Sequence, residues 1–175
     1  MTVPAVPDSP WRRSWRGDPA GAVLADRHYN RQKPGSPQFV PPGRCLVLLT
    51  ADRSAIWVTS WPMAEYVRHA WPGAWINSLF RREGGPYLAS DLIRAAVAHT
   101  RAEWPDTPAL GMVTFVDPAK IRSKRDPGRC YRKAGFAVAG QTKGGLVALQ
   151  MTPDLMPDAA STPSDQLDLL EGLAA

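Results

Sequence analysis

The sequence has few of the residues that build disulfide frameworks, zinc sites and membrane spans. Only two of its 175 residues are cysteine, Cys45 and Cys130, and they form no C-x-x-C pair. Zinc sites and disulfide scaffolds need more numerous and more closely spaced cysteines. No apolar run approaches the roughly 18 residues of a membrane-spanning helix, and the first residues lack the basic-then-apolar order of an export signal. We therefore expect a soluble cytoplasmic protein with reduced thiols and no membrane partner.

Acidic residues are in the minority. The chain carries 16 Asp and Glu against 21 Lys and Arg, which gives a formal charge of +5. This balance favours an acidic partner, nucleic acid first. At 44% hydrophobic residues, the chain is long enough to bury the core of one domain.

The two ends differ from the middle in composition. Residues 1–17 are rich in proline and carry a cluster of tryptophan and arginine, Trp11, Arg12, Arg13, Trp15 and Arg16. We expect a flexible basic arm there, free or in contact with nucleic acid. Residues 153–175 are rich in Pro, Ser and Asp, so we expect a disordered acidic tail. The main folded domain is then expected over residues 18–152.

The middle of the chain alternates between strand and helix patterns. Its periodicity predicts helices over residues 18–29, 89–104 and 129–134, and strands over residues 45–50, 55–61, 75–82, 109–116, 136–139 and 146–151. Asp18 is the expected N-cap of the first helix, and Pro105 ends the second. This order predicts an α/β (α+β) fold, a single domain with a mixed central sheet flanked by helices.

A basic loop follows the apolar strand at residues 109–116. Asp117 ends that strand, and Tyr131 lies on the first turn of the next helix. Seven basic residues fall within fourteen positions here, against one acidic residue: Lys120, Arg122, Lys124, Arg125, Arg129, Arg132 and Lys133. A cluster of one sign can be a solvated face, but it is also what contact with a nucleic-acid backbone requires.

Tyr131, Gly135 and Phe136 form a Tyr-x-x-x-Gly-Phe motif, and a strand, a glycine turn and a helix precede it. This arrangement resembles the GCN5-related N-acetyltransferase superfamily. The resemblance implies a sheet of that type, a turn that binds the pyrophosphate of coenzyme A through Arg82, Gly84 and Gly85, and a Tyr131 that protonates the departing thiolate. The turn departs from the family pattern, which is Arg/Gln-x-x-Gly-x-Gly/Ala.

A narrower set of residues resembles the Mom DNA-modification proteins of phage Mu type, divergent members of the same superfamily. The set is the His28-Tyr29 pair, Ser90 on the long helix, Asp117 before Pro118, and Tyr131. The resemblance implies an enzyme that converts adenine in DNA to an N6-carbamoylmethyl-type base, in a bacterial host, and so protects phage or prophage DNA from restriction. It also implies an active-site iron and use of an acetyl donor such as acetyl-coenzyme A.

The same resemblance assigns roles to single residues. It implies that Ser90, Asp117 and Tyr131 are catalytic, and that His28, Tyr29, Asp117 and Tyr131 hold the iron. One imidazole, one carboxylate and two phenols form a hard set of donors that suits iron or manganese better than a thiol-preferring ion. An arginine expected on the third strand is Arg81 or Arg82, or is displaced.

Several readings stay open at this stage. An acetyl-coenzyme A-dependent N-acyltransferase acting on a small amine or a protein needs no metal, and a non-catalytic nucleic-acid-binding module needs no chemistry at all. Four tryptophans are candidates either for the core or for stacking on an extruded base, Trp57, Trp61, Trp71 and Trp75. We expect DNA as partner, coenzyme A as a further candidate, and leave a homodimer open.

Overall fold

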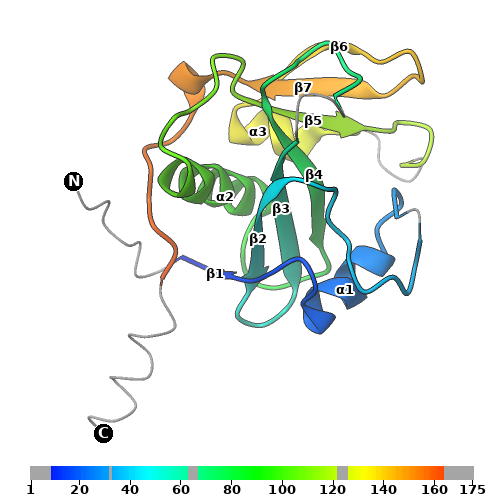
Figure 1. The fold of residues 1–175 in the computed structure, drawn as a ribbon, viewed down its shortest axis with the longest axis vertical. Helices are drawn as coiled ribbons and strands as arrows, with labels where there is room; N and C mark the ends of the chain where they lie inside the picture. Colours follow the sequence, from blue (N-terminus) through cyan, green and yellow to red (C-terminus); the bar gives the residue numbers. More distant parts are fainter. Residues whose placement is uncertain (1–8, 32, 63–66, 122–125, 164–175) are drawn as a thin grey trace, which may run out of the picture.

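The protein is built on one seven-stranded sheet in our computed structural model, which describes residues 9–31, 33–62, 67–121 and 126–163 (Figure 1). The strands are β1 (Trp11–Arg13), β2 (Arg44–Thr50), β3 (Ala55–Trp61), β4 (Trp75–Arg82), β5 (Met112–Val116), β6 (Ala137–Gln141) and β7 (Val147–Met151). The helices are α1 (Pro19–Asp26), α2 (Ala89–Glu103) and α3 (Arg129–Ala134), with a short 3-10 turn, η2 (Pro153–Leu155). Among the helices of the described residues, none combines the length and the apolar character that crossing a membrane requires.

The strand order is β1-β2-β3-β4-β5-β7-β6. Neighbouring strands are antiparallel except β4 and β5, which are parallel. The prediction of a single mixed sheet with helices is confirmed. The bounds of β3, β4 and α3 agree with the predicted ranges, and the other elements differ at their ends. Among these, α1 ends at Asp26 rather than near residue 29, and β5 begins at Met112 rather than at residue 109.

The two faces of the sheet are covered by different elements, because residues alternate along each strand. In β2, Leu46 and Leu48 face the core under α2 and α3, whereas Val47 and Leu49 face α1. Figure 1 shows α2 and α3 on one side of the sheet and α1 on the other. Helix α1 lies close to the sheet at Gly21, where an added Cβ would lie 3.0 Å from Cδ1 of Ile56 on β3.

Residues 9–17, predicted to be part of a flexible arm, are instead part of the domain. Trp11 is fully buried in the main core, and its indole N–H donates to the Leu92 carbonyl of α2 at 2.9 Å. Strand β1 pairs with β2 from Trp11↔Thr50 to Arg13↔Leu48. The sequence pattern did not predict β1, because a strand of three residues is too short to show an alternation of apolar and polar side chains. Residues 1–8 lie outside the described residues.

The start of the predicted acidic tail is also packed against the domain. Met156 is buried in the main core, and the Ala160 N–H donates to the Ala98 carbonyl of α2. The imidazole of His99 joins both ends of the chain, with Nε2 2.7 Å from Ser9 Oγ and Nδ1 2.5 Å from the Ala160 carbonyl. The prediction of disorder is therefore wrong for residues 153–163, and residues 164–175 lie outside the described residues.

The two tryptophans of the former arm give a matched test of this packing. Trp11→Ala removes a fully buried indole and its hydrogen bond, so we expect the free energy of unfolding to fall by about 3–5 kcal/mol. Trp15 is 60% exposed, and Trp15→Ala should change it by less than about 0.5 kcal/mol. Urea unfolding of both variants measures this. Equal small effects would show that β1 does not belong to the folded domain.

Candidate functional site

The site begins where the two parallel strands part. Strands β4 and β5 pair only over their first three residues, Trp75–Asn77 with Met112–Thr114. Beyond this point the pairing of β4 with β3 shifts register, so that Ser78 is an extra residue between the Thr59↔Asn77 and Val58↔Leu79 pairs. A β-bulge of this kind bends its strand and increases the local twist. The ends of β4 and β5 therefore diverge, and the space between them is left to side chains and loops.

A cavity of about 840 Å³ occupies this opening. Its lining comes from the segment after α1, from β4, from the end of β5 and from α3, and includes His28, Tyr29, Asn77, Asp117 and Tyr131. Sites of about 300–1,000 Å³ typically bind drug-sized molecules. The cavity is therefore large enough for a nucleoside or for part of a nucleotide cofactor.

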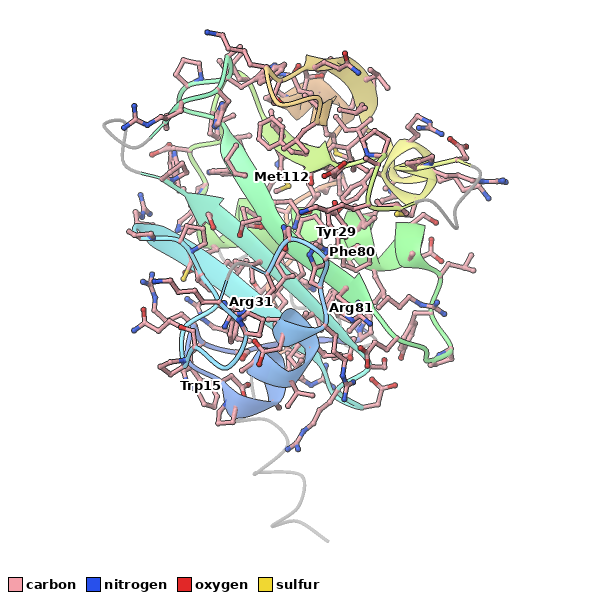
Figure 2. All side chains as sticks on the ribbon, turned by 90° about the vertical axis from the view of Figure 1, so that its right-hand side faces the viewer. Trp15, Tyr29, Arg31, Phe80, Arg81 and Met112 are labelled. Atoms are coloured by element: carbon pink, nitrogen blue, oxygen red, sulfur yellow. The ribbon has the colours of Figure 1, made fainter. Side chains whose placement is uncertain are left out.

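Figure 2 views this side of the molecule. Tyr29, Phe80 and Arg81, all lining residues, lie together near its centre, and Trp15 lies farther away beside α1.

The segment after α1 is braced internally by Arg31. Its guanidinium pairs with Asp26 at 2.8 Å and donates to the carbonyls of Ser36 and Gln38. Asp26 also accepts the Gly35 N–H at 3.0 Å. These contacts order a proline-rich loop that has no regular structure of its own.

His28 and Tyr29 both reach the cavity because they lie outside α1. Adjacent residues within a helix point about 100° apart, but α1 ends at Asp26 and the two rings stack with centroids 4.5 Å apart. Nδ1 of His28 contacts the side-chain oxygen of Asn30 and lies 3.3 Å from its backbone N–H.

The imidazole of His28 is held in its neutral form. Burial lowers the pKa of His28, and the positive charge of Arg81 lowers it further, against the opposing effect of the hydrogen bonds to Asn30 and to the Phe80 backbone. A neutral imidazole is the form that binds metals or accepts a proton.

Tyr29 and Asp117 meet at the end of β5. The Asp117 N–H lies 3.4 Å from the Tyr29 hydroxyl oxygen, and Asp117 Oδ1 accepts the Ala119 N–H at 3.0 Å. Burial, together with the nearby Asp117 carboxylate, raises the pKa of Tyr29. The phenol therefore keeps its proton at neutral pH and can act as a hydrogen-bonding group.

Tyr131 is carried into the cavity by α3. Gly128 and Gly135 bound this helix at φ +80° and +114°, backbone conformations that favour glycine. The Tyr131 hydroxyl donates to Asn77 Oδ1 at 2.7 Å, and Thr114 Oγ1 lies 3.1 Å from the same oxygen. Burial raises the pKa of Tyr131 far above its ordinary value, so it too is a neutral phenol.

The other predicted site residues divide between the cavity and its surroundings. Arg82 lines the cavity, and its guanidinium donates to the carbonyls of Tyr87 and Gly85. Ser90, Gly84 and Gly85 are not among the lining residues, although Ala89, which precedes Ser90, is.

The predicted nucleic-acid contacts also differ from one another. Lys120 is exposed and lines the cavity, and Arg129 and Lys133 are exposed on α3. Arg132 is tied to Asp126 and to the Pro127 carbonyl. Arg122, Lys124 and Arg125 lie outside the described residues.

The four tryptophans considered for base stacking are not lining residues. Trp57 and Trp75 are fully buried in the main core, and Trp61 packs against Trp75 with ring centroids 5.9 Å apart. Trp71 packs beside Phe115 on the face opposite α2 and α3. Within the described residues, Phe115 and Phe80 are the aromatic side chains of the cavity besides His28, Tyr29 and Tyr131.

Asn77 has a structural role that the sequence did not identify. Simple spacing along the third predicted strand would put the arginine of the family pattern at this position. One sequence feature could have identified this role. Asn77 falls on the same face of β4 as Trp75 and Leu79, which are both buried. A polar residue at such a position must find internal partners.

The cavity is lined by nitrogen and oxygen donors of the kind that iron prefers. His28 and Asp117 are the residues that could bind a metal ion, with the phenols of Tyr29 and Tyr131 as further oxygen donors. Both phenols would have to lose protons that burial favours. No group of three His, Cys, Asp or Glu side chains placed for a metal ion is found among the described residues.

The chain matches no model of a known protein family, and no curated protein matches it.

The state of His28 can be measured directly. We expect its Cε1 proton to titrate below the ordinary value of 6.5, since burial disfavours the imidazolium. As pH falls from 6.5 toward the folded pKa, the unfolded chain takes up this proton first, so stability is lost in that window. An NMR pH titration, with the signal assigned by its absence in His28→Ala, tests this. A midpoint at or above 6.5 would contradict it.

Proposed function

We propose that this protein is a Mom-like enzyme of the GCN5-related N-acetyltransferase superfamily that modifies the N6 amino group of adenine in DNA. The observation that supports it is the shared cavity. Its lining includes His28 and Tyr29 from one segment, Asp117 from another and Tyr131 from a third. These are four of the five residues on which the resemblance to Mom proteins depends, Ser90 being the one that does not line the cavity, and they are separated by up to about a hundred positions in the chain.

The charge around the cavity favours a nucleic-acid substrate. Two lining arginines are partly neutralised, since Arg31 pairs with Asp26 and Arg81 with Glu83. Lys120 is exposed at the cavity, and Arg129 and Lys133 are exposed on the adjacent α3. Cations at this rim can bind phosphates while a base enters the opening. Adenine inside a duplex has to leave the stack before its amino group reaches such a site.

The roles of the site residues follow from their states. The neutral His28 is the group able to accept a proton near neutral pH. Asp117 supplies the negative charge of the cavity and is the carboxylate candidate for iron. Iron, when bound, would supply Lewis-acid or redox chemistry, with His28 and Asp117 as the residues to hold it.

Nucleoside analysis tests the proposal. DNA from a bacterial host expressing the protein under iron-replete conditions should contain a new adenine nucleoside, detected by mass spectrometry. His28→Ala and Asp117→Asn should each lower its amount by roughly 100-fold or more, the scale of losing a proton-transfer group. Asp154→Asn, an exposed carboxylate on η2 away from the cavity, is the matched control and should retain it.

The metal is tested on the purified protein. Elemental analysis should find iron that is lost in His28→Ala and kept in Asp154→Asn. An unchanged nucleoside profile with the wild-type protein would remove the proposed function, whatever the metal content.

A coenzyme A-dependent acyltransferase is the second candidate, and the start of α2 favours it. Ala89, the first residue of this 15-residue helix, lines the cavity, and the N-cap Leu88 makes no side-chain cap hydrogen bond. Helix N-termini bind phosphates through their free N–H groups, and the guanidinium of Arg82 lies beside this one.

Thermal or urea unfolding with coenzyme A tests this candidate. At a concentration one hundred times its Kd, coenzyme A should stabilise the protein by about 2.7 kcal/mol. Arg82→Ala should weaken binding about tenfold, because a charge-assisted contact is lost. Arg13→Ala is the control. Arg13 lies on the edge strand β1, does not line the cavity, and pairs with Glu103 of α2. No stabilisation of the wild-type protein would exclude this second function.

A further inference from the structure

The amide of Asn77 is fully used by the protein. Its Nδ2 donates to the carbonyls of Val58 and Leu79 at 3.1 and 2.9 Å. Its Oδ1 lies 2.7 Å from the Tyr131 hydroxyl and 3.1 Å from that of Thr114. A side-chain amide has two N–H donors and two acceptor lone pairs, so all four are engaged.

These contacts also fix which way the amide points. If Asn77 were turned by 180°, its oxygen would face the Val58 and Leu79 carbonyls, and two acceptors cannot hydrogen-bond to each other. The bulge in β4 lies beside this contact, because the register of β3 and β4 shifts between Val58 and Thr59. Oδ1 must therefore accept, and the Tyr131 hydroxyl must donate to it.

This direction decides what Tyr131 can offer a ligand. A phenol has one proton to donate and a lone pair to accept with. The proton is committed to Asn77 Oδ1, 2.7 Å away. The neighbouring Thr114 hydroxyl directs its one proton at Asn77, so Tyr131 presents an acceptor to the cavity that it lines. A role as proton donor to a leaving group, or as a phenolate on a metal, would require breaking its bond to Asn77.

We propose that Tyr131 recognises the substrate as a hydrogen-bond acceptor for an exocyclic N–H, so that the cavity selects a base with an amino group over a base with an oxo group at the same position. Asn77 is the positioning residue that sets this polarity. The assignment rests on the proposed function for the identity of the ligand, a nucleobase, and adds the contact that distinguishes adenine from its 6-oxo analogue, hypoxanthine.

A binding comparison tests the proposal. The probes are short single strands of thymidine with one central adenine or one central hypoxanthine, titrated at one fixed salt concentration by fluorescence anisotropy. We expect the wild-type protein to bind the adenine strand about tenfold more tightly, the discrimination typical of one well-placed base contact. Equal affinity, or no binding to either strand, overturns the proposal without any variant being needed.

Variants then attribute the preference to the phenol. Tyr131→Phe keeps the ring contacts with Phe80 and Phe136 but removes the acceptor, so the ratio of the two affinities should fall to about one. Tyr87→Phe removes the same hydroxyl from a tyrosine that does not line this cavity, and the ratio should be unchanged. A ratio that survives in Tyr131→Phe contradicts the assignment.

Asn77→Ala separates positioning from simple structural support. It frees the Tyr131 hydroxyl to donate, so the preference for adenine should narrow or invert toward the oxo base. If Asn77 had only a structural role, its loss would weaken the binding of both DNA strands by the same factor and leave the ratio of affinities unchanged. This outcome would overturn the positioning role of Asn77.

The two proposals fail separately. Adenine preference without any modified nucleoside in the host would remove the enzymatic function and leave the recognition contact. Modified adenine in the host without a binding preference for adenine would support the enzymatic function and remove the recognition contact.

Discussion

The structure depends on how the sheet solves one local problem, the separation of two parallel strands. The pairing of β4 with β5 ends at Asn77, next to the bulge at Ser78. There the side-chain amide of Asn77 hydrogen-bonds to the backbone carbonyls of Val58 and Leu79, and it ties the third and fourth strands to α3 through Tyr131. The cavity is therefore a consequence of sheet geometry, and its deepest contacts are part of the stabilising network of the fold.

Secondary structure was predictable because most elements carry strong local signals. Strands β3 and β4 and helix α3 were found at their observed bounds, since apolar alternation and glycine or proline boundaries are encoded within each segment. Strand β1 was not predictable, because its stability comes from burying Trp11 against α2, a contact across eighty-one positions. The same holds for residues 153–163, whose anchor is a histidine on another element.

The sequence could predict which residues line the candidate site, but it could not predict which of their groups donate and which accept hydrogen bonds. A resemblance of short motifs was enough to name four residues that line one cavity. It gave no information about proton positions, which depend on the partner of each hydroxyl. For Tyr131 that partner is an amide beside a bulge, a feature visible only once the register of β3 and β4 is known. Ser90 and the two glycines, which the motif also named, lie outside the lining.

A single imidazole connects the two ends of the described chain. His99 lies in α2 and is 2% exposed, with Ser9 on one ring nitrogen and Ala160 on the other. Detaching either segment would leave a buried ring nitrogen of His99 without its hydrogen-bond partner. That cost makes the remaining contact between His99 and the other segment less stable. The first and last parts of the fold should therefore open together, as one cooperative unit.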